Sequence, residues 1–149
     1  MDTRFRHRHA LHRVHSLFRL KVHDFLTVGA AAPLQEAGGV ALRQPKSYYD
    51  QLAAGYRARR DFFCEALEGA GFAFSPPSGA YYVMADIKAF GYPDDRAFAD
   101  FLVRDIGVAA VPGSSFYRDA AGGAHQIRFA FCKQRQTLEA AAERLAKLR

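Results

Sequence analysis

Hydrophobic and polar residues alternate most clearly in the segment 126–133. Side chains of an extended segment point to opposite faces in turn, and one face here receives Ile127, Phe129 and Phe131. The pattern predicts a strand over 126–132 that holds Arg128 on the other face, between small neighbours. A planar guanidinium on a rigid backbone can bind a carboxylate through two parallel hydrogen bonds. An arginine on a solvated sheet face is the alternative, and spacing alone favours it.

Apolar residues spaced by three and four predict helices in three further segments. The clearest helix is 47–69, which Ser47 can cap and which Gly69 and Gly71 end. A second helix is expected over 94–105, and a third over 136–148. Two smaller features complete the pattern: Asp94 or Asp95 as the cap of the second helix, and a short helix over 34–42 that Pro33 begins.

Three more strands are expected, at 72–75, 81–87 and 108–111. The second of them is apolar on both faces, which predicts that both faces are covered. Together with the strand over 126–132, these segments predict an α+β fold: a small mixed or antiparallel sheet, covered on one side by the helices.

Length and composition are those of one globular domain. Its 149 residues are 50% hydrophobic, enough for one core and too few for two. No apolar run reaches the roughly 18 residues of a membrane helix, and the basic N-terminus lacks the apolar core of a secretory signal. We therefore expect a cytoplasmic protein without membrane contact, in which Cys64 and Cys132 are buried thiols.

The net charge of +6 is concentrated at the N-terminus. Residues 1–20 hold five arginines and one acid, so they carry four of the six net charges. Their histidines, His7, His9, His12 and His15, have spacings that can converge on a metal ion. A basic arm for nucleic acid and an organellar presequence are further readings. We favour a disordered or non-native leader, and predict no metal site and no nucleic-acid binding.

Three segments carry a resemblance to a known family. Gly-Ala-Tyr-Tyr-Val-Met-Ala-Asp at 79–86, Val-Ala-Ala-Val-Pro-Gly-Ser-Ser-Phe-Tyr at 108–117 and Ile-Arg-Phe-Ala-Phe-Cys-Lys at 127–133 resemble the C-terminal part of class I/II aminotransferases. These are pyridoxal-phosphate enzymes of fold type I, usually homodimers, that act on amino acids and 2-oxo acids. The resemblance implies that Arg128 binds the substrate α-carboxylate, and that Ser114 and Phe116 also contact substrate.

The resemblance also shows what this chain would lack. The family's Schiff-base lysine lies in a Ser/Thr-rich context followed by glycine, and no lysine here does: Lys21, Lys46, Lys88, Lys133 or Lys147. That lysine, the aspartate of the pyridine nitrogen and most of the phosphate site belong upstream of Lys21 in the family. No catalytic residue is therefore expected in this chain.

We interpret the chain as a fragment: a leader at 1–20, a remnant of the interdomain helix and linker at 21–46, and the aminotransferase small domain at 47–149. The resemblance covers the last third or so of a typical family member. The leading functional hypothesis is a truncated, split or frameshifted aminotransferase that is inactive alone. The alternatives are a non-catalytic partner subunit of a split enzyme and a nucleic-acid-binding module with a basic arm.

Overall fold

The computed structural model describes residues 31–148, and these fall into two compact units. Residues 31–45 belong to the first unit and residues 46–148 to the second. In the first, helix α2 (Ala32–Leu42) has Pro33 in its first turn, as predicted, and buries none of its residues. The predicted leader, with its histidines and arginines, lies outside the described residues.

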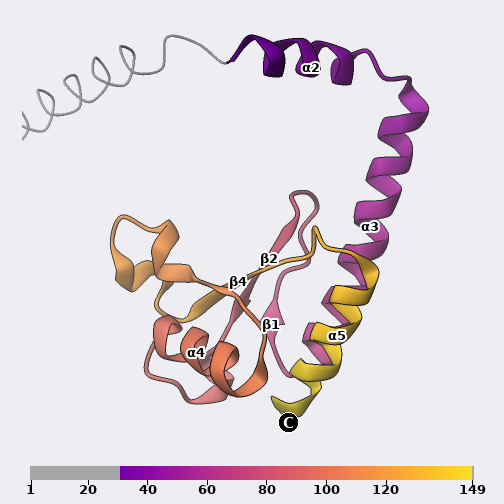
Figure 1. Cartoon of the computed structure of the whole chain (residues 1–149). Coiled ribbons are helices and arrows are strands. Elements are labelled where there is room, and N and C mark those ends of the chain that lie inside the picture. The colour runs from indigo at the N-terminus through magenta and orange to yellow at the C-terminus, as the bar shows by residue number, and fades with distance from the viewer. Residues whose placement is uncertain (1–30, 149) are drawn as a thin grey trace, which may run out of the picture. The chain divides into compact units, whose positions relative to one another are not determined.

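The second unit is built on a four-stranded antiparallel sheet (Figure 1). Its strands are β1 (Ala73–Phe74), β2 (Tyr82–Asp86), β3 (Val111–Pro112) and β4 (Gln126–Ala130), in the order β1-β2-β4-β3. The predicted α+β fold is confirmed, and the sheet is antiparallel throughout. Strand β4 lies inside the sheet, paired with β2 on one side and β3 on the other.

Two strand predictions need correction. The predicted strand 108–111 is displaced to Val111–Pro112, because the Val108 N–H donates to Leu102 O at the end of a helix instead of to a strand. Strand β2 is buried on one face only: Val83 and Ala85 are buried, whereas Tyr82 and Met84 are half-buried. The other strands begin or end one or two residues inside their predicted bounds.

Three helices accompany the sheet, and the structure corrects their ends. Helix α3 (Lys46–Gly69) begins before Ser47, so that serine lies in the first turn and is not the cap. Asp94 caps α4 (Asp95–Phe101), which continues as a π-helical turn, η2 (Leu102–Ile106), and ends at Gly107 with φ +76°. Helix α5 (Arg135–Leu145) runs into a 3₁₀ turn, η5 (Ala146–Leu148). No helix in the described range is both long and apolar enough to cross a membrane.

The core lies on the face of β4 that the alternation predicted. Ile127, Phe129 and Phe131 are each at most 2% exposed. The Phe129 ring meets the ring of Phe63 from α3 edge-on, with centroids 6.0 Å apart. Side chains of the other helices join the same cluster: Leu67, Phe98, Leu102, Leu138 and Leu145. One face of the sheet therefore supplies the hydrophobic driving force for the fold.

The two cysteines are free, and only one is fully enclosed. Cys64 is buried on α3, and desolvation raises the pKa of its thiol above the ordinary value. Cys132 is half-buried, because it follows β4 on the face opposite the core. The prediction of two buried thiols is thus right for Cys64 and only partly right for Cys132.

Helix α3 is apolar along one side for its whole length but is buried only in its second half. Leu67 is fully buried, whereas Leu52, on the same side of the helix, is 45% exposed.

We expect Leu67→Ala to lower the free energy of unfolding by about 2–5 kcal/mol, because it leaves a cavity in the core. The matched Leu52→Ala variant should cost less than about 1 kcal/mol. Urea denaturation of both variants measures the difference, and equal losses would mean that Leu52 is covered in solution.

Candidate functional site

Arg128 lies in the middle of β4, where pairing on both sides fixes its backbone. Its register partners are Met84 on β2 and Val111 on β3. Its immediate neighbours in the strand, Ile127 and Phe129, are buried in the core, so its side chain leaves the opposite face of the sheet. The structure thus places Arg128 where the sequence predicted: on a rigid strand, half-buried.

Two aromatic rings lie against the Arg128 guanidinium. Its Cζ is 4.3 Å from the centre of the Phe116 ring and 5.0 Å from that of Tyr82. Tyr82 is two residues from Met84, the partner of Arg128, so it is the diagonal neighbour on the same face. Cation–π contacts of this kind stabilise a guanidinium by about 0.5–2 kcal/mol and limit the orientations of its plane.

Buried polar atoms at this place have no partner. Within residues 31–148, Arg128 Nε and Ser114 Oγ are enclosed and make no hydrogen bond. None of the ion pairs in this range involves Arg128 either. A buried N–H donor without an acceptor costs about 1–3 kcal/mol, so other interactions must hold the guanidinium in this position.

Ser114 and Phe116 belong to one 3₁₀ turn, η3 (Gly113–Phe116), which directly follows β3. A second 3₁₀ turn, η4 (Ala120–Gly123), packs against it backbone to backbone. A Cβ added at Gly113 would lie 2.6 Å from Gln126 O and 2.7 Å from Gly123 O, so only glycine fits. This packing holds the turn next to the start of β4.

Asp95 and Tyr82 are parts of this arrangement that the sequence analysis missed. Asp95, the first residue of α4, is 2% exposed, and its Oδ2 accepts a hydrogen bond of 2.6 Å from Ser114 N. The sequence offered Asp95 only as an alternative helix cap, and Tyr82 only as a part of the motif at 79–86. Of the predicted site residues, the structure brings Arg128 and Phe116 into contact and places Ser114 in the same turn.

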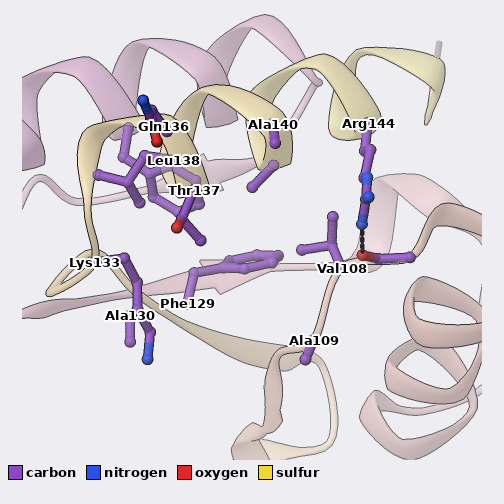
Figure 2. A pocket seen from close by; sticks show the side chains of 13 residues that line it. Val108, Ala109, Phe129, Ala130, Lys133, Gln136, Thr137, Leu138, Ala140 and Arg144 are labelled. Carbon is purple, nitrogen blue, oxygen red and sulfur yellow. Dashed lines mark hydrogen bonds between the residues drawn. The ribbon is translucent and has the colours of Figure 1, made fainter.

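Open pockets lie near the sheet in the described part of the chain. One, of about 520 Å³, lies between α5 and Phe129, and Figure 2 shows Arg144 at one end, donating to Gly107 O at 2.7 Å. Arg128, Phe116 and Ser114 are not among the residues that line it. Another, of about 560 Å³, is lined by Tyr82, whose ring also lies against Arg128, but Arg128 itself does not line it.

The described lysines do not form a site for pyridoxal phosphate. Lys46 pairs with Asp50, and Lys88 lies near Asp86; both lysine side chains are largely exposed. Lys133 and Lys147 are exposed as well, and Lys21 lies outside the described residues. Lys133 lines the pocket beside α5 together with Gln136, Thr137 and Arg144, but no acid lines that pocket to hold the pyridine nitrogen, so these residues do not fit the cofactor on their own. In the same range, no three His, Cys, Asp or Glu side chains come together as metal ligands would.

Comparison with known proteins identifies the family. The model for aminotransferase class I and II matches residues 17–145. The probable N-succinyldiaminopimelate aminotransferase of Mycobacterium tuberculosis is 37% identical over 133 residues, which cover 84% of this chain and 34% of that protein. The methionine aminotransferase of Escherichia coli is 38% identical over 129 residues, covering 86% and 33%.

A solved structure agrees with these sequence relatives. The N-succinyldiaminopimelate aminotransferase from Mycobacterium tuberculosis superposes with a TM-score of 0.76 at 36% identity, covering 85% of this chain and 33% of that one. The chain thus spans about a third of the length of the relatives that it matches. On the strength of the family match and of these relatives, the chain belongs to the class I and II aminotransferases.

Proposed function

We propose that this chain is the carboxylate-binding, small-domain part of an aminotransferase, and that Arg128 binds the α-carboxylate of an amino acid and of the matching 2-oxo acid. The observation that carries the proposal is that Arg128 makes no ion pair within residues 31–148, although it lies on a strand paired on both sides and beside two rings that limit its plane. The relatives are named for different amino acids, so the proposal covers the reaction class.

The guanidinium acts by position and charge. Its fork offers two parallel N–H donors to the two oxygens of a carboxylate, and an uncharged group gains less from this contact. Phe116 and Tyr82 hold the plane of the fork, and the unpaired Ser114 Oγ supplies a further polar atom in the adjoining turn. One such contact contributes about 1.5–3 kcal/mol, which corresponds to an affinity on the order of 10 mM.

Catalysis needs groups that the described residues do not supply. Class I and II aminotransferases depend on pyridoxal phosphate, which carries the amino group between substrates. We propose that its lysine and phosphate site lie in sequence equivalent to the remaining two thirds of the relatives, and that the complete enzyme is a homodimer. A cytoplasmic location stays a prediction from composition.

A second candidate is a partner subunit that completes a split enzyme, and one observation favours it. Large apolar side chains are exposed on the second unit, at 37–53% of their full area: Tyr48, Tyr49, Leu52, Tyr81, Val103, Val111, Phe116 and Tyr117. If these side chains form one contiguous patch in the folded protein, another protein segment would be expected to cover it. Reading the genomic DNA upstream of the Met1 codon in all frames separates a longer chain from a separate partner gene.

Replacing Arg128 should abolish carboxylate binding. We expect the full chain to bind pyruvate with a dissociation constant on the order of 10 mM, and the Arg128→Gln variant to show no saturable binding. Arg118→Gln is the matched control, because it removes the same charge from an exposed position and should bind as the original does. Backbone-amide NMR shifts at constant ionic strength measure binding. Equal binding by the two variants would contradict the assignment of Arg128.

The chain alone should not form a specific covalent adduct with pyridoxal phosphate. The described lysines are exposed, and none lines a pocket with an acid for the pyridine nitrogen, so equimolar pyridoxal phosphate should leave no stoichiometric adduct on any one lysine after borohydride reduction. Mass spectrometry of the digested protein measures this. One lysine modified to completion would overturn the proposal that the chain is inactive alone.

A further inference from the structure

Within residues 31–148, Asp95 and Ser114 are the buried polar or charged residues, at 2% and 8% exposure, and the Asp95 side chain is bonded to the Ser114 backbone. Oδ2 of Asp95 accepts a short hydrogen bond, of 2.6 Å, from Ser114 N. Burying a carboxylate is unfavourable unless its partners compensate for the lost water. The Asp95 carboxyl group is buried and accepts a hydrogen bond from the Ser114 N–H. This indicates that the position of the Ser114 backbone is important for the fold or for the site.

Helix capping does not account for Asp95. Its neighbour Asp94 already caps α4, with Oδ1 accepting from Arg96 N at 3.0 Å and from Ala97 N at 2.8 Å. The Asp95 carboxylate instead reaches 19 residues along the chain, to the turn η3. Its function is therefore a tertiary one, between α4 and that turn.

The turn in question ends at the ring that lies against Arg128. Ser114 is the second residue of η3, and Phe116 is its last. The Phe116 ring centre is 4.3 Å from Arg128 Cζ, the closer of the two ring contacts of that guanidinium. On the other side, η3 is fixed by the close approach of Gly113 to Gly123 and Gln126. The hydrogen bond from Ser114 N to Asp95 therefore fixes the turn η3 to helix α4.

We propose that Asp95 is a positioning residue for Arg128: by binding the Ser114 N–H, it sets the turn η3 so that Phe116 lies on the guanidinium. That Arg128 binds a carboxylate rests on the function proposed above. The contact that Asp95 controls exists without any ligand, so the two ideas can fail separately.

The test follows the side-chain NMR signals of Arg128 in the full chain. The Phe116 ring shifts the Hδ and Hε resonances of Arg128, and Phe116→Leu gives their values without the ring. Asp95→Ala should move these resonances most of the way to the Phe116→Leu values. Asp95→Asn keeps an acceptor oxygen for Ser114 N and should give an intermediate shift, which remains readable if the alanine variant does not fold.

Asp94→Ala is the matched control. It removes the cap of the same helix and the same charge, so it should destabilise the protein but leave the Arg128 resonances unchanged. A merely structural function of Asp95 would make the two aspartates behave alike. Pyruvate binding should weaken about two- to fivefold in Asp95→Asn, the change expected when a cation–π contact is loosened.

Each outcome decides between the ideas. Arg128 resonances that do not move in Asp95→Asn or Asp95→Ala, but do move in Phe116→Leu, would overturn the positioning function of Asp95. Resonances that move as expected in a chain that binds no pyruvate would support Asp95 as a positioning residue and overturn the proposed function. Resonances that do not move even in Phe116→Leu would overturn the ring contact itself, and the proposal with it.

Discussion

The alternation along β4 is the constraint on which the rest of the structure depends. Ile127 and Phe129 are buried on one face, and each contributes about 1.5–3 kcal/mol by leaving water. A slip of one residue would bring them out and move Arg128 into the apolar core, so the register is strongly specified. The burial of its neighbours is therefore what fixes Arg128 on the other face, and no interaction of the arginine itself is required.

The surroundings of Arg128 restrict its side chain but leave one of its hydrogen-bond donors without an acceptor. The rings of Phe116 and Tyr82 limit the plane of the guanidinium, while its Nε stays buried without an acceptor in the described part of the chain. A fold tolerates such a group where other interactions determine its position. Here these are the strand pairing of β4 and the Asp95 hydrogen bond that holds the turn carrying Phe116. The arrangement suits an anion that completes it.

Sequence patterns predicted the elements of this fold well and its connections less well. The alternation in β4 and the spacing in α3 are properties of single segments, so they can be read locally. The shift of β3 could not be predicted from a local pattern. It arises because the Val108 N–H donates to the carbonyl of Leu102, at the end of a helix, and not to a neighbouring strand. Strand β2 is buried on one face only, and this depends on which elements cover the sheet, which no local pattern indicates.

In the candidate site, too, some residues could be predicted from the sequence and others only from the structure. Alternation placed Arg128 on the face away from the core, but by itself it favoured a surface charge; the motifs around it suggested carboxylate binding. Phe116 was named from the same motifs, and its ring contact became visible only in the structure. Asp95 was missed because, beside Asp94, an acid at a helix start looks like a cap. Its partner is 19 residues away, and no local pattern indicates that pairing.

The most direct test of the central claim is to observe the Arg128 Nε–H resonance by NMR while pyruvate is added to the full chain, with chloride replaced so that ionic strength stays constant. The account predicts that this resonance moves downfield and saturates, and that the other arginines move little. Pyruvamide, which has the same shape but no charge, should leave it in place. An Arg128 signal that moves no more than the other arginines, or that responds equally to pyruvamide, would contradict the claim that Arg128 is a carboxylate-binding residue.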